Sequence, residues 1–351
     1  MEGSCMWVFR ISANSACRRS VLCLLAAIVL TGCTNREQFI PAPGTYDARI
    51  LRDEWGVPHI FGAHDADAAY GLAYAECEDD WVEMERAMLL ARGTLARVDG
   101  TKGAQFDYVV QWFRLREFVD EKCERELSAE FRKVAEAYAA GITHYAALHP
   151  ANMPSLSLPV TGKDIVAGAV LKAPFFYSLD SDLETMMAEE KGLPITDKGK
   201  VGRAESHGLP YVSDQALGSN GWAVGRAKSA DGAVRLMVNS HMPFEGPVTF
   251  YQAHVHSGDG WNMDGATFPG GCMLFMGHDE NKGWVHTISR PDLADIYKLD
   301  MNPDNPNQYR FDGAWRDLER KTAKLRVKLW GPIHVIARRE LLWSVHGPAW
   351  R

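Results

Sequence analysis

The chain changes from helical to strand periodicity near residue 190, and this change restricts it to an α+β arrangement. Before that point apolar residues recur at helical spacing, most clearly in a stripe that begins near Ser128 and ends at His149-Pro150. Residues 189–218 are charged, rich in glycine and without an amphipathic period, so we expect an exposed linker that tolerates proteolysis. Beyond the linker, short strand-like runs alternate with turn residues, at 222–225, 234–238, 249–256, 273–277, 283–289 and 296–299.

Three further elements are predicted before the linker. Residues 45–61 alternate as a β-hairpin does, with a turn at 53–56. A helix capped by Asp65 or Asp67 follows, because positions 73, 77, 81, 84 and 88 are apolar, and Gly93 is a plausible stop. A last helix over 162–173 opens with the cap-like residue Thr161.

Composition indicates a globular chain of one large domain or two ordinary ones. Of its 351 residues 46% are apolar and 11 are Trp, which implies a buried core. The net charge of −7 without a basic block argues against nucleic acid as a partner. No organic cofactor is predicted. Beyond residue 33 the cysteines are Cys77, Cys123 and Cys272, which suggest neither a disulfide framework nor a zinc site. The histidines at 254, 256, 278 and 286 also match no zinc spacing.

The N-terminus reads as an export signal. A basic segment precedes an apolar run at 21–30, which is too short for a transmembrane helix. The following Leu-Thr-Gly-Cys resembles a bacterial lipobox, in which Cys33 would be lipidated. We therefore expect a lipoprotein signal peptide at 1–33, a tether at 34–44, and a periplasmic protein anchored by lipid to a bacterial membrane, with the outer membrane favoured. The alternative is an ordinary secretory signal in which the cysteine is there by chance.

The junction between the linker and the first strand-like run is the candidate reactive site. The polar segment ends at Gly218 and the strand-like run begins at Ser219. If the chain were cut between them, Ser219 would carry a hydroxyl and a free α-amine, a nucleophile and a base in one residue. The pKa of an α-amine is about 8, so part of it is unprotonated near neutral pH. The alternative is that Gly-Ser-Asn forms a simple turn.

Several short motifs resemble the penicillin acylase family of N-terminal nucleophile hydrolases. They occur in family order over 45–351: GVPHI at 56–60, DAAYGLAYA at 67–75, EMER at 83–86, ARG at 91–93, GSN at 218–220, HTIS at 286–289 and HGP at 346–348. The family includes penicillin, cephalosporin, aculeacin and acyl-homoserine lactone acylases, and the chain is most similar to the last group.

The resemblance implies a precursor that cuts itself between Gly218 and Ser219. Residues 45–190 would be the α-chain region, 191–218 an excised spacer peptide, and 219–351 the N-terminal part of the catalytic β chain. The fold implied is the four-layer αββα arrangement of N-terminal nucleophile hydrolases, here incomplete.

Two more catalytic roles follow from the resemblance. The backbone N–H of Ile288 would bind the oxyanion of the tetrahedral intermediate, although an isoleucine there also suits a buried strand. His241 would orient the α-amine of Ser219, the alternative being a surface or structural histidine beside a proline turn. A histidine at this position argues against a phenylacetyl substrate and favours an acyl-homoserine lactone.

A structural Ca²⁺ site is also implied. In several relatives the positions of Asp292 and Asp295, together with an α-chain Glu, bind calcium, and Glu184 is the best candidate for that Glu. Oxygen ligands from distant segments suit Ca²⁺. The alternatives are two solvated loop acids and a charge on a helix surface.

The expected activity is hydrolysis of the amide bond of an N-acyl substrate, an acyl-homoserine lactone or a β-lactam side chain, through an acyl-enzyme. Family members are much longer, and their second oxyanion donor, an Asn side chain, lies beyond the position of Arg351. We therefore expect the front half of such an enzyme. The alternative is a truncated, inactive lipoprotein of acylase ancestry, or one half of a split enzyme.

Overall fold

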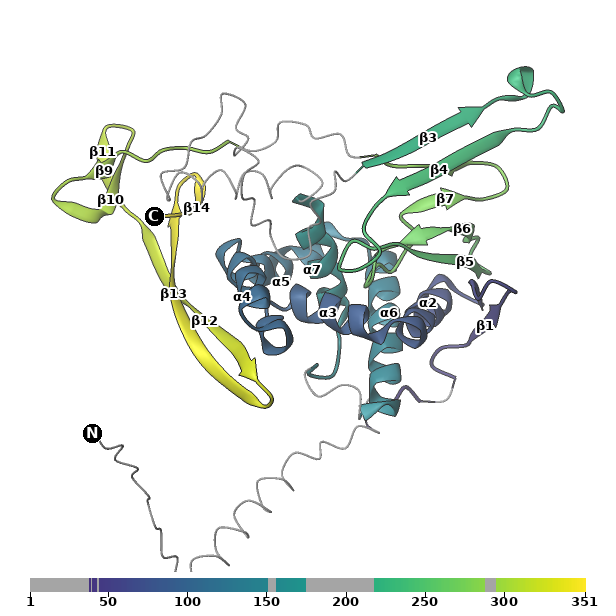
Figure 1. Cartoon of the computed structure of the whole chain (residues 1–351), viewed down its shortest axis with the longest axis horizontal. Helices are drawn as coiled ribbons and strands as arrows, with labels where there is room; N and C mark the ends of the chain where they lie inside the picture. The colour runs from purple at the N-terminus through teal and green to yellow at the C-terminus, as the bar shows by residue number, and fades with distance from the viewer. Residues whose placement is uncertain (1–37, 39, 43, 151–155, 175–217, 288–294) are drawn as a thin grey trace, which may run out of the picture.

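The computed structural model describes residues 38, 40–42, 44–150, 156–174, 218–287 and 295–351. Within these residues a block of helices lies between a six-stranded sheet and a long β-hairpin (Figure 1). The chain is α+β, as the sequence predicted. Among the described residues, no helix combines the length and the apolar composition needed to cross a membrane.

The helices follow one another before the linker. They are α2 (Asp65–Asp79), α3 (Trp81–Ala91), α4 (Ala96–Trp112), α5 (Leu115–Glu126), α6 (Ala129–Leu148) and α7 (Gly162–Lys172). The predicted helices that begin near Ser128 and over 162–173 are confirmed as α6 and α7, and Thr161 is the N-cap residue of α7 as predicted. The Ser128 side chain caps α6. Neither α4 nor α5 was predicted.

The single helix predicted through residues 73–88 is wrong, because the structure has two helices there, α2 and α3, separated at Asp80. The Asp80 side chain accepts a hydrogen bond from the backbone N–H of Glu83 at 3.1 Å and so caps α3. The cap of α2 also differs from the prediction. His64 is its N-cap residue, and Asp67 accepts from the His64 N–H at 3.0 Å.

The six-stranded sheet joins strands from both sides of the linker. Its order is β1 (Ala48–Arg52), β2 (Pro58–Gly62), β5 (Tyr251–Ser257), β6 (Asn262–Thr267), β7 (Met276–His278) and β8 (Gly283–Trp284). The predicted β1–β2 hairpin is confirmed. All pairs are antiparallel except β2–β5, which is parallel. Helix α2 packs on this sheet at Gly71, where an added Cβ would lie 2.8 Å from Ala48 and Ile60 side-chain atoms.

Three smaller sheets complete the described chain. Their strands are β3 (Gly218–Val224) and β4 (Arg235–His241), with a short 3-10 helix (Arg226–Lys228) between them; β9 (Met301–Asn302), β10 (Asn305–Phe311) and β11 (Ala314–Asp317); and β12 (Glu319–Trp330), β13 (Ile333–Ser344) and β14 (Gly347–Ala349). The predicted strand at 296–299 is absent, since residues 295–300 form no strand. The long β12–β13 hairpin packs against α4, where the Trp343 indole N–H donates to the Trp112 carbonyl at 2.7 Å.

Asp164, in the first turn of α7, connects three helical segments through buried ion pairs. Its carboxylate accepts from Arg92 at 2.8 Å and from Arg116 at 2.9 Å, and it also accepts the backbone N–H of Thr161 at 2.9 Å. The Asp164 side chain is only 3% exposed. Burial alone would raise the pKa of Asp164, but the hydrogen bonds and positive charges of the two arginines hold it below its ordinary value of 3.8.

We expect Asp164→Asn to lower the free energy of unfolding by about 3 kcal/mol at pH 7, because it leaves two arginines without their carboxylate. The folded-state pKa of Asp164 lies below the unfolded one, so its stabilisation is present above pH 3.8 and is lost as pH falls through the lowered pKa. Urea unfolding at pH 7 and at pH 3 measures both effects. The variant should lose less stability than wild type between these pH values.

Asp120→Asn is the matched control. Asp120 pairs with Lys163 at 3.1 Å on the neighbouring surface, but its side chain is 58% exposed. An exposed pair contributes about 1 kcal/mol or less. Equal losses in the two variants would contradict the role assigned to Asp164.

Candidate active site

Ser219 lies at the start of β3, in a hairpin that projects from the helical block (Figure 1). Strand β3 pairs antiparallel with β4 in a register that places Gly218 opposite His241 and Ser219 opposite Ser240. Gly218 and Ser219 are half-buried, whereas most of β3 beyond them is exposed. The register thus brings two of the predicted site positions, Gly218 and His241, directly together.

The Ser219 hydroxyl contacts the peptide group that the predicted cut would break. Its Oγ donates a hydrogen bond to the Gly218 carbonyl oxygen at 2.6 Å. The carbonyl oxygen of Ser219 in turn accepts from the Thr287 hydroxyl at 2.9 Å. The nucleophile candidate and its neighbouring peptide are therefore held from two sides.

Residues 285–287 approach β3 closely at Gly221. A Cβ at Gly221 would lie 2.2 Å from Cγ1 of Val285, so only glycine fits there. Sequence reasoning assigned no role to Thr287, although the HTIS motif contains it. The signal available was its position directly before Ile288.

The His241 imidazole lies beside the Gly218 end of β3. Its Nε2 atom is 2.9 Å from Oδ1 of Asn239 and 3.1 Å from Nδ2 of Asn220. Side chains of successive strand residues point to opposite faces, so His241 and the Ser219 hydroxyl lie on opposite faces of the hairpin. In this position the His241 imidazole is better placed to contact the backbone at Gly218-Ser219 than to take the proton of the Ser219 hydroxyl. Sequence reasoning also missed the two asparagines.

The other predicted site residues are not brought together in the described part of the chain. Ile288, Asp292, Glu184 and Cys33 lie outside the described residues. Asp295 is described and is exposed. Within the described ranges, no group of three or more His, Cys, Asp or Glu residues could hold a metal ion. The calcium ligand set therefore stays a prediction.

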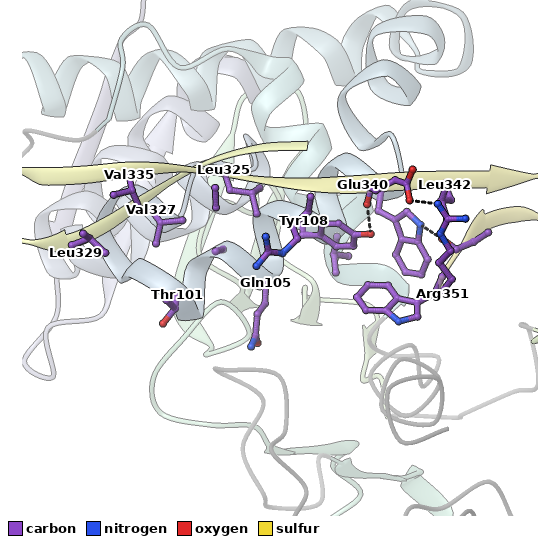
Figure 2. Close-up of a pocket in the computed structure, with 17 residues that line it drawn as sticks. Thr101, Gln105, Tyr108, Leu325, Val327, Leu329, Val335, Glu340, Leu342 and Arg351 are labelled. Atoms are coloured by element: carbon purple, nitrogen blue, oxygen red, sulfur yellow. Dashed lines mark hydrogen bonds and ion pairs between the residues drawn. The ribbon is translucent and has the colours of Figure 1, made fainter. Parts of the chain in front are cut away.

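A large apolar cavity lies elsewhere, between α4 and the β12–β13 hairpin (Figure 2). It measures about 760 Å³ and includes Tyr108, Trp112 and Leu325 in its wall. The Tyr108 hydroxyl donates to the Glu340 carbonyl at 3.0 Å across this wall. No residue of β3 or β4 lines the cavity, so it is not part of the Ser219 site.

A buried polar cluster in the helical block is likewise separate from Ser219. The Tyr138 hydroxyl donates to Glu76 Oε2 at 2.7 Å, while Glu76 Oε1 has no hydrogen-bond partner among the described residues. Burial raises the pKa of Glu76 to about 8, and burial also lowers the pKa of Lys172 to about 8. These groups belong to α2, α6 and α7, and none of them contacts the β3–β4 hairpin.

Sequence comparison identifies relatives of the chain. The acyl-homoserine lactone acylase PvdQ of Pseudomonas fluorescens is 26% identical over 341 residues, which cover 92% of this chain and 43% of that protein. The aculeacin-A acylase of Actinoplanes utahensis is 22% identical, over 88% of this chain and 42% of its own length. The chain thus spans less than half the length of these relatives.

A solved structure of the thermostable penicillin G acylase from Alcaligenes faecalis matches 44% of this chain and 87% of its own, with a TM-score of 0.31 and 22% identity. The family assignment rests instead on the family model for penicillin amidase, which matches residues 47–351. This chain belongs to the penicillin amidase family.

Proposed function

We propose that the chain supplies the nucleophile of an exported amidohydrolase that cuts itself between Gly218 and Ser219 and then uses Ser219 to hydrolyse an N-acyl amide. One observation carries the proposal: the Ser219 hydroxyl lies 2.6 Å from the Gly218 carbonyl oxygen, where the linker meets β3. The family membership supports an acylase reaction.

Self-cleavage begins with attack by Ser219 Oγ on the carbonyl carbon of Gly218. The hydroxyl proton moves to the Ser219 nitrogen as the peptide C–N bond breaks, which leaves Gly218 joined to Oγ as an ester. Water hydrolyses this ester. The products are a carboxylate at Gly218 and, at Ser219, a free hydroxyl and a free α-amine.

Turnover repeats the attack on the substrate amide. The α-amine takes the Ser219 hydroxyl proton through a water molecule, Oγ attacks the carbonyl carbon, and the amine of the substrate leaves with that proton, so that the acyl group is joined to Oγ as an ester. Water then hydrolyses this ester, which releases the carboxylic acid and restores the Ser219 hydroxyl. The Ile288 N–H would stabilise the oxyanion. His241 acts as a positioning residue for the α-amine, which fits its place beside Gly218 on the face away from the hydroxyl.

An acyl-homoserine lactone is the substrate class that we favour, and a β-lactam side-chain amide is the second. The names of several relatives support the first, as does the histidine at 241. We further propose that the complete fold is the four-layer αββα sandwich, with 45–190 and 219–351 as parts of its α and β chains and 191–218 as the excised spacer.

The competing proposal is an acylase-derived lipoprotein that no longer turns over, or one half of a split enzyme. This alternative predicts an intact chain on purification, or cleavage without amide hydrolysis.

We expect the purified protein to contain a polypeptide that begins at Ser219, and Ser219→Ala to leave the chain intact, because the attacking oxygen is gone. N-terminal sequencing and intact mass spectrometry measure this. Ser219→Cys should retain part of the cleavage, since a thiol is also a nucleophile. Ser240→Ala is the matched control, as Ser240 lies directly opposite on β4. Cleavage that persists in Ser219→Ala would exclude the mechanism.

We propose that the protein is exported and carries lipid on Cys33, in the periplasm. In cells that express the chain, labelled palmitate should be incorporated into wild type and lost from Cys33→Ala, because only that thiol follows the lipobox residues. Cys23→Ala, a change in the apolar run of the same segment, should label like wild type. Equal labelling of all three would leave only an ordinary secretory signal.

We propose that Glu184, Asp292 and Asp295 bind a structural Ca²⁺. Chelation should then lower the melting temperature of wild type but not that of Asp295→Ala, because a carboxylate ligand is missing in the variant. Adding Ca²⁺ to protein freed of all metals should raise the melting temperature of wild type but not that of Asp295→Ala. Asp304→Ala, in a nearby exposed turn, is the control. Equal sensitivity of Asp295→Ala and wild type to chelation would contradict the site.

A further inference from the structure

Two histidines face each other across the parallel pair β2–β5. His59 on β2 lies directly opposite His254 on β5, and their Nδ1 atoms are 3.2 Å apart. Both side chains are half-buried, and the rings meet at 62° with their centroids 5.1 Å apart. The two nitrogens that approach each other are thus on neighbouring strands of one sheet, not in a mobile surface loop.

The outer nitrogen of each ring faces an oxygen acceptor. Nε2 of His254 is 3.0 Å from Oδ1 of Asn262, on β6. Nε2 of His59 is 3.7 Å from Oδ2 of Asp53. The other oxygen of Asp53 is fixed by the backbone N–H groups of Trp55 and Val57, both at 2.9 Å, so the carboxylate is held in place.

The Asn262 oxygen and the Asp53 carboxylate favour a proton on the Nε2 atom of each ring. If each Nε2 donates its proton to its acceptor, both Nδ1 atoms present lone pairs to each other across 3.2 Å. Two lone pairs at that distance repel unless a cation lies between them. Ligating histidines characteristically donate their other N–H to a carboxylate or carbonyl oxygen. Such an oxygen lies 3.0 Å from Nε2 of His254, and the Asp53 carboxylate lies 3.7 Å from Nε2 of His59, within ion-pair but not hydrogen-bond distance.

The separation also fits a metal. Imidazole nitrogens bind Zn²⁺ at about 2.0–2.1 Å, and two such bonds at a tetrahedral angle place the nitrogens about 3.3 Å apart. Imidazole ligands suit Zn²⁺, Ni²⁺ and Cu²⁺, whereas Ca²⁺ prefers oxygen. Among the described residues no group of three or more His, Cys, Asp or Glu could hold a metal, so water would complete the coordination.

We propose that His59 and His254 together bind one divalent transition-metal ion between their Nδ1 atoms. His59 precedes the Gly218-Ser219 junction and His254 follows it. The metal would therefore also join the two polypeptides after cleavage, a consequence that rests on the proposed function.

The test is a titration of the purified chain with Ni²⁺ by isothermal titration calorimetry, in wild type and in Ser219→Ala. We expect one saturable Ni²⁺ per chain in both, with affinity reduced about tenfold or more in His254→Asn and about tenfold in Asn262→Ala, which removes the acceptor of the ring proton. His256→Asn is the matched control, because His256 lies on the same strand and face but outside the pair. It should bind like wild type.

Melting curves without metal verify that each variant folds. At one fixed Ni²⁺ concentration, wild type, Ser219→Ala and His256→Asn should gain more thermal stability than His254→Asn and Asn262→Ala. Equal binding by wild type and His254→Asn, or no binding by wild type because only a proton lies between the rings, would overturn the site. Binding in a chain that is never cut would support the site while refuting self-cleavage.

In cleaved wild type, Ni²⁺ should raise the urea concentration that separates the two polypeptides. No rise would refute the joining role.

Discussion

The parallel pairing of β2 with β5 is the contact on which the rest of the sheet depends. It joins residues 195 positions apart, so that a hairpin from before the linker becomes the edge of a sheet built mainly after it. Ile60 and Val255, both fully buried, lie side by side in this pair and bind the sheet to the helical core. Helix α2 packs against the same strand pair, because Gly71 has no side chain that would collide with Ile60. The motif glycine is therefore a packing requirement and not a catalytic group.

The sequence predicted those helices whose first residues are fixed by neighbouring side chains. Ser128 caps α6 with its own side chain, and Thr161 forms a capping box with Asp164 at the start of α7. These two helices were predicted within a residue or two. The break at Asp80 was missed because its cap lies inside a continuous apolar period. Helix α4 was missed because Gly100, with a φ of 61°, interrupts it and reads as a turn in the sequence. The β2–β5 pairing joins segments on the two sides of the linker, and hydrophobic periodicity does not predict contacts between distant segments.

In the candidate site, too, some features could be predicted from the sequence and others depend on tertiary contacts. The Gly218-Ser219 junction could be found from the sequence, because composition changes there. The face occupied by His241 could not, since it depends on hydrogen-bond register, and a slip of one residue would move the imidazole to the side of the Ser219 hydroxyl. The Thr287 contact depends on a third segment that reaches β3 only because Gly221 has no side chain. The sequence thus located the proposed nucleophile, while tertiary packing determines its surroundings.

Among the described residues, a cut at Gly218-Ser219 would leave the two parts in contact at several places, of which two carry buried apolar contacts. One is the β2–β5 pair. The other lies beyond the helices, where the Trp343 indole donates to the Trp112 carbonyl at 2.7 Å and the Trp112 indole donates to Ala349 at 3.1 Å. Both regions are part of one buried apolar cluster, whose contacts do not depend on the broken peptide bond. Since apolar burial contributes in proportion to area, cleavage removes a covalent link but little of the free energy that holds the parts together.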